Sequence, residues 1–123
     1  MTVSIIDAKN YPRLVEGKGK KILFDSPDFH VWIHGTYAGH IGTMHKHTAD
    51  ETFFCIEGEA TFHFKDRAPE KLTPGMLIVI PKGDFYVIEN SGSGYLNLLG
   101  TRCETNKKPR FGEAGNLMPS TAT

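Results

Sequence analysis

The stretch that decides the fold is GHIGTMHKHTADETFFCIEG, residues 39–58, which places His45, His47 and Glu51 close together and ends on a glycine. Histidines two positions apart on an extended strand project from the same face, so both imidazoles can reach one ion. Two histidines and one carboxylate form a triad that holds a divalent ion and leaves coordination positions open. The segment predicts a metal site, and two surface histidines beside a solvated glutamate are the alternative interpretation.

On both sides of this stretch, short apolar runs alternate with turns that contain glycine and proline. This pattern is typical of an all-β sandwich or barrel. Glu57 and Gly58 are expected to form a hairpin turn, with Gly58 supplying the positive φ that such turns need. We expect strands at residues 21–25, 29–36, 52–56, 60–64, 76–80, 85–89 and 95–102.

Several of the expected strands are apolar on both faces. Phe53 and Cys55 alternate with Phe54 and Ile56, and the run at 76–80 is entirely apolar. One exposed sheet does not explain this pattern, whereas two packed sheets bury one face each. We expect the N-terminal segment or a second subunit to cover part of the outside, and a homodimer is the predicted assembly.

The 123 residues are expected to form one domain. Its predicted parts are an N-terminal strand or arm at 1–19, a core barrel at about 20–103 and a C-terminal tail at 104–123. We expect the last five residues of the tail to fray. Phe111, Leu117 and Met118 are candidates to anchor the middle of the tail to the barrel.

Charge and composition favour a small molecule or another protein as the partner. Fourteen basic residues balance fourteen acidic ones, so no net field draws the chain to nucleic acid or to an anionic membrane. The first ten residues have no basic start or long apolar run, and the aliphatic run MLIVI is too short to span a bilayer. We therefore predict a cytoplasmic protein, with Cys55 and Cys103 as reduced thiols.

The glycine spacing extends the metal hypothesis to a family. Residues 39–58 have the spacing G-x5-H-x-H-x3-E-x6-G of the first cupin motif, without a gap. Residues 75–90, GMLIVIPKGDFYVIEN, have the spacing of the second, with Tyr86 and Asn90 at two of its positions. The chain resembles a small single-domain cupin of the type-2, conserved-barrel kind. The resemblance implies an RmlC-like double-stranded β-helix, or jelly-roll barrel, with a metal at the bottom of its mouth.

Tyr86 departs from the family pattern, which usually has a histidine there as the fourth ligand. A phenolate that binds the ion, which would suit ferric iron, is one interpretation. A proton donor or acceptor beside the ion is another. In the third interpretation the Tyr86 ring only fills space, and the ion has three protein ligands. The implied metal set is His45, His47 and Glu51 with Tyr86, and the ion is a divalent transition metal, Fe, Ni, Mn or Zn, among which the sequence does not choose.

Parity along the strands suggests which residues line a substrate pocket. Phe53 and Cys55 share the face of Glu51, and Ile88 shares the face of Tyr86. A structural role in the core is the commoner outcome for a buried cysteine. These residues and Trp32 are the predicted pocket.

Other polar residues have less decided positions. His30 and His34 share a face with Trp32, but the sequence does not settle whether that face is inside. An inward Arg102 would select a carboxylate substrate through a bidentate pair. A position on the surface is the expectation, because charged residues are seldom buried alone. His40 and His63 lie off the motif spacing and are expected on the surface or in loops.

The predicted function is that of a metal-dependent enzyme of small-molecule metabolism. The open coordination positions would take an oxygen-rich substrate, with Tyr86 moving a proton. Oxidoreductase (dioxygenase), isomerase and lyase chemistries all occur in similar cupins, and the fold does not choose among them. The alternative is a non-catalytic cupin that binds a sugar or an effector.

Overall fold

The computed structural model describes residues 2–15 and 19–118 of the chain, so the expected fraying at 119–123 lies outside the described residues. No helix in the described part is long and apolar enough to cross a membrane. The strands are β1 (Lys20–Asp25), β2 (His30–Thr36), β3 (His45–Lys46), β4 (Glu51–Glu57), β5 (Ala60–Phe64), β6 (Glu70–Leu72), β7 (Leu77–Ile80), β8 (Tyr86–Asn90), β9 (Leu96–Arg102), β10 (Arg110–Gly112) and β11 (Leu117–Met118).

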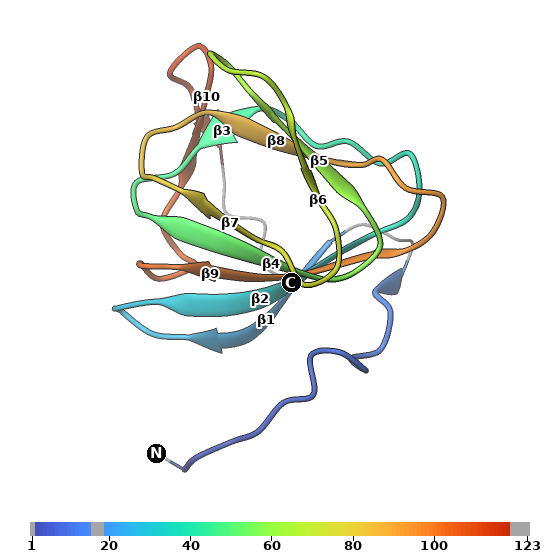
Figure 1. Ribbon diagram of the computed structural model, residues 1–123. Helices are drawn as coiled ribbons and strands as arrows, with labels where there is room; N and C mark the ends of the chain where they lie inside the picture. Colours follow the sequence, from blue (N-terminus) through green and yellow to red (C-terminus); the bar gives the residue numbers. More distant parts are fainter. Residues whose placement is uncertain (1, 16–18, 119–123) are drawn as a thin grey trace.

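The strands form two antiparallel sheets that face each other (Figure 1). One sheet has the order β1-β2-β9-β4-β7, and the other has the order β11-β10-β3-β8-β5-β6. Neighbours in both sheets come from distant parts of the chain, as β9 lies between β2 and β4. This arrangement confirms the predicted all-β jelly roll.

Each of the seven expected strands is present, with ends displaced by at most one residue. Four short strands, β3, β6, β10 and β11, were not among the expected ranges. In the tail, β10 pairs with both β3 and β11, so Phe111 lies opposite Lys46 and Leu117. Strands of two or three residues carry too little periodicity to be recognised before their partners are known.

The core lies between the two sheets. Phe53, Phe62 and Leu98 are fully buried there with neighbours from both sheets. On the outside, the N-terminal segment contacts β9, since Asn97 donates a hydrogen bond to the Ala8 carbonyl at 3.2 Å. It does not cover Phe54 on the outer face of β4, whose side chain is 40% exposed.

The turn after β4 requires glycine. Gly58 has a φ of 88°, in the region that side chains with a Cβ rarely adopt. A Cβ at this position would also lie 2.4 Å from the carbonyl oxygen of Tyr95. The predicted positive φ is therefore confirmed, and packing against the residue before β9 adds a second reason for it.

Candidate functional site

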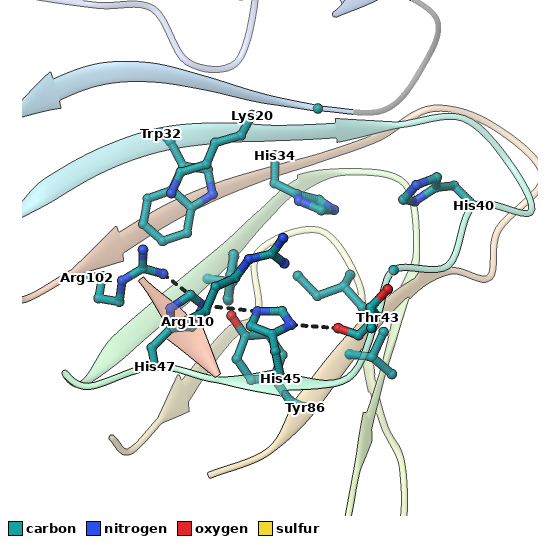
Figure 2. Close-up of a pocket in the computed structure, with 15 residues that line it drawn as sticks. Lys20, Trp32, His34, His40, Thr43, His45, His47, Tyr86, Arg102 and Arg110 are labelled. Atoms are coloured by element: carbon teal, nitrogen blue, oxygen red, sulfur yellow. Dashed lines mark hydrogen bonds between the residues drawn. The ribbon is translucent and has the colours of Figure 1, made fainter. Parts of the chain in front are cut away.

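A cavity of about 460 Å³ opens between the two sheets. Its size falls within the range of small-molecule sites in proteins. Figure 2 shows side chains from β1 and β2 on one side of this space and side chains from β3 and β8 on the other. The titratable residues that line it are Lys20, His34, His40, His45, His47, Tyr86, Arg102 and Arg110.

The two histidines of the first motif lie next to each other on the β3 side of the cavity. His45 and His47 lie on and directly after β3, and their Nε2 atoms are 3.0 Å apart. The Nδ1 atom of His45 lies 2.6 Å from the Thr43 carbonyl oxygen. A carbonyl only accepts, so Nδ1 carries the ring proton and Nε2 of the neutral ring is a lone pair.

The Nε2 atom of His47 is also unprotonated. Nη1 of Arg102 lies 3.1 Å from Nε2 of His47. A guanidinium only donates, so this Nε2 accepts. Burial, followed by the charge of Arg102, lowers the pKa of His47, and burial lowers the pKa of His45 to about 4. Both rings are therefore neutral at pH 7, and their two unprotonated Nε2 atoms lie 3.0 Å apart, with the one on His47 also accepting from Arg102.

Glu51 begins β4 and contributes a carboxylate beside the histidines. Its Oε1 atom is 4.0 Å from Nε2 of His47, is buried and has no hydrogen-bond partner in the described structure. Its Oε2 atom accepts a hydrogen bond from Nη1 of Arg102 at 3.0 Å. Burial raises the pKa of Glu51, and Arg102 opposes that effect. One carboxylate oxygen is thus held by Arg102 while the other is unsatisfied.

These donors fit a metal ion in chemical type. Two imidazole nitrogens and an unsatisfied carboxylate oxygen form an electron-rich point at which a cation would relieve the repulsion of the lone pairs. The triad is not preassembled, since no group of three or more His, Cys, Asp or Glu within residues 2–15 and 19–118 is arranged to hold an ion. The physical reason is Arg102, which binds both His47 and Glu51.

Tyr86 lies opposite His45 in the pairing of β3 with β8, and the two ring centroids are 4.8 Å apart. Its hydroxyl is hydrogen-bonded to the Glu51 carboxylate. Burial and then Glu51 raise the pKa of Tyr86 well above 10. In this structure Tyr86 therefore keeps its proton beside the Glu51 carboxylate, and among the interpretations of Tyr86 this favours the proton donor.

The residues predicted to line a pocket divide into two groups. Trp32, Phe53 and Ile88 line the cavity. Cys55 is fully buried in the core and is not among the described residues that line it. Its thiol lies 3.8 Å from the carbonyl oxygen of Glu57 and 3.6 Å from that of Gly58. Cys55 therefore packs against the turn that follows β4.

The expectation that Arg102 lies on the surface is wrong. Its side chain is only 3% exposed, because β9 lies directly beside β4 and pairs Arg102 with Glu51. A second carboxylate, on Glu104, lies 3.3 Å from its Nε atom. The guanidinium also packs 5.2 Å from the ring centroid of Trp32. Gly100 leaves room for that ring, since a Cβ there would lie 2.3 Å from it.

The strand 30–36 turns His30, Trp32 and His34 inward, which settles the open question of its inner face. His63 lies on the outer side of β5 and pairs with Glu89 at 2.7 Å. His40 does not behave as a surface residue, because it lines the cavity.

Other cavity residues were not singled out in the sequence. Lys20, Thr43 and Arg110 line the cavity, and no motif spacing marks them. Lys20 and Arg110 belong to β1 and β10, which lie at opposite ends of the chain. Lys20 begins the strand KKILFD, which has no alternation of apolar and polar residues to mark Lys20 as inward.

Two facing antiparallel sheets with a histidine-lined cavity between them define a double-stranded β-helix protein. The model of the cupin domain family matches residues 35–100, which is more than half of the chain. This protein therefore belongs to the cupin family, as its two motifs predicted. No curated protein matches the sequence.

Solved structures show the same fold at low identity. An uncharacterised double-stranded β-helix protein from Klebsiella pneumoniae is 18% identical, with a TM-score of 0.76 over 97% of this chain and 98% of its own. An RmlC-like cupin from Methanocaldococcus jannaschii is 17% identical, with a TM-score of 0.72 over 85% and 94%. The DMSP lyase from Ruegeria pomeroyi is 21% identical, with a TM-score of 0.64 over 74% of this chain and only 46% of its own.

Proposed function

We propose that this cupin binds a divalent transition metal at His45 and His47, with Glu51 as the third ligand, and uses the adjoining cavity to bind and activate a small oxygen-rich substrate. The observation that carries the proposal is the approach of two unprotonated imidazole nitrogens, the Nε2 atoms of His45 and His47, to 3.0 Å. The unsatisfied Oε1 atom of Glu51 supports it, since a buried carboxylate oxygen without a partner is costly.

Such an ion, when bound, supplies Lewis acidity for an oxygen of the substrate. The chain's own residues do the rest. Tyr86 holds a proton next to Glu51, and a neutral phenol can donate to an oxygen on which negative charge develops. Trp32 and Phe53 exclude water from one wall. The DMSP lyase among the structural neighbours supports an enzyme over a passive binding module only as an analogy of fold.

Metal binding tests the proposal directly. We expect protein stripped with a chelator to bind Co²⁺ with the visible absorption of nitrogen and oxygen ligation. His45→Ala and His47→Ala should each weaken that binding by at least about tenfold, because each removes one converging lone pair. Isothermal titration and absorption spectroscopy measure both effects.

His63→Ala is the matched control, because it removes a histidine on the outside of the barrel that pairs with Glu89. It should leave the Co²⁺ affinity unchanged. Equal affinity in wild type and in His45→Ala would exclude a metal centre here. Binding without turnover of any small oxygenated substrate would favour the non-catalytic alternative.

We also propose a homodimer that covers the outer face of β4 and β7. Phe54 and Leu77 lie opposite each other on this face, 40% and 56% exposed, and Val79 beside them is 62% exposed. In the described structure, β7 pairs with β4 alone, so the apolar patch continues to the sheet edge. A second copy of the same patch would bury it symmetrically.

Val79→Lys should convert that dimer to a monomer, because it places two like charges at the centre of a symmetric contact. Light scattering after size exclusion measures the mass. Lys21→Glu, at an exposed position of β1 on the opposite edge of the same sheet, is the control. A wild-type protein that is already monomeric would contradict this part of the proposal.

A further inference from the structure

The cavity has a positive lining. Three cationic side chains reach it from three separate strands, Lys20 from β1, Arg102 from β9 and Arg110 from β10. No Asp or Glu is among the described residues that line it. Glu51 and Glu104 neutralise Arg102 at 3.0 Å and 3.3 Å. Lys20 and Arg110 add further positive charge to the same lining.

Lys20 is an unusual residue for the interior, because its side chain is buried without a carboxylate at contact distance. The residue is 7% exposed, and its Nζ atom lies 3.0 Å from Nε2 of His30 and 2.8 Å from Oδ1 of Asn106. The ring of Trp32 lies 4.1 Å below it. These neighbours are uncharged at pH 7, since burial lowers the pKa of His30 to about 4.

The pKa values of the two cations show that their charged forms are disfavoured in this position. Burial and then Arg102 lower the pKa of Lys20 to about 7, and burial lowers the pKa of Arg110. Buried charges are normally paired. A negative group in the cavity would relieve the repulsion between these cations, so the lining is suited to an anion.

A neutral imidazole completes the wall. The Nε2 atom of His34 is buried and has no hydrogen-bond partner in the described structure, although the ring borders the cavity (Figure 2). Burial lowers the pKa of His34 to about 4, so it is neutral. An unsatisfied buried nitrogen facing a cavity indicates a ligand atom in hydrogen-bond reach. Trp32 and Phe53 provide the apolar part of the same space.

We propose that the cavity selects a small organic oxyanion, a carboxylate or phosphate monoester with a compact uncharged body, whose negative end lies toward Lys20 and Arg110 and within reach of His34. This inference deepens the proposed function and rests on it only in taking the same cavity as the substrate site. Arg110 supplies fork-shaped donors suited to either oxyanion. Lys20 supplies charge that no contacting carboxylate offsets.

Charge-matched probes test the proposal. Isothermal titration of metal-free protein with butanoate, propyl phosphate and the neutral analogue butanamide compares an anion with an uncharged molecule of the same shape. We expect at least one anion to bind about tenfold or more tightly than the amide. Lys20→Met and Arg110→Gln should each reduce that preference to about threefold or less. Lys21→Met, at the exposed neighbouring position, should leave it unchanged.

Folding is checked by thermal unfolding, and Arg110→Gln on the more exposed β10 serves if Lys20→Met does not fold. Equal affinity for anion and amide, or no binding of any probe at about 10 mM, would overturn the proposal. A preference that survives both substitutions would also overturn it, since the anion would then bind without Lys20 and Arg110. A preference that persists in His45→Ala supports it even if the metal proposal fails.

Discussion

Arg102→Met is expected to lower the free energy of unfolding by about 3–5 kcal/mol, because it removes one partner of a buried ion pair and leaves the other charged. Arg102 and Glu51 are 3% and 1% exposed at their side chains and lie 3.0 Å apart. Glu104 loses its partner in the same substitution. Urea denaturation at neutral pH measures the change.

The double substitution Arg102→Met with Glu51→Met separates this explanation from loss of packing. It removes both charges of the pair, so we expect it to recover a large part of the lost stability. If the double variant were as unstable as Arg102→Met, packing against Trp32 rather than the uncompensated carboxylate would be the cause.

The same variant should depend on pH in a defined direction. Arg102 opposes the rise in the pKa of Glu51 that burial causes, so without Arg102 that pKa rises further. A folded-state pKa above the unfolded one means that the stability deficit grows as pH rises and shrinks as pH falls toward about 4.5. The difference between Arg102→Met and wild type should therefore decrease at low pH. A difference that is constant with pH would contradict the assigned role of Glu51.

The second large effect is loss of stability in mild acid, through His30 and His34. Burial lowers the pKa of each to about 4. Because these values lie below the unfolded value of about 6.5, the stability is fully present above that pH and is lost as pH falls toward 4. Each group contributes about 1.4 kcal/mol per pH unit in this window, so we expect a loss of about 4 kcal/mol between about pH 6.5 and about pH 5.

The charged neighbours of each ring strengthen this expectation. Lys20 and Arg102 disfavour protonation of His30, whereas the Glu104 carbonyl and Asp25 favour it. His34 faces His40, Lys20 and His45, all of which disfavour a proton on it. His34→Gln should reduce the pH dependence in urea denaturation, to which His45 and His47 also contribute, whereas His63→Gln on the outside of β5 should not. An unchanged slope in His34→Gln would contradict the assignment.

Local pattern was enough for most of the fold. Strands of four or more residues were predictable because apolar runs bounded by glycine and proline leave few alternatives. The two-residue strand β3 was not, although His45 and His47 on and beside it were recognised from their spacing. Tyr86 was identified as an inward residue by parity, but its proton and its bond to Glu51 depend on burial that no local pattern describes.

The sequence by itself determined a two-sheet barrel, its glycine turns and the approach of two histidines, since these depend on periods of a few residues along the chain. Only the tertiary structure decided the chemistry around them. Pairing of β9 with β4 brings Arg102 to Glu51, and the position of β1 and β10 brings Lys20 and Arg110 to the cavity. Such contacts join residues about fifty to ninety positions apart in the sequence. Electrostatic interactions depend on the distance between the charges in space, not on their separation along the chain.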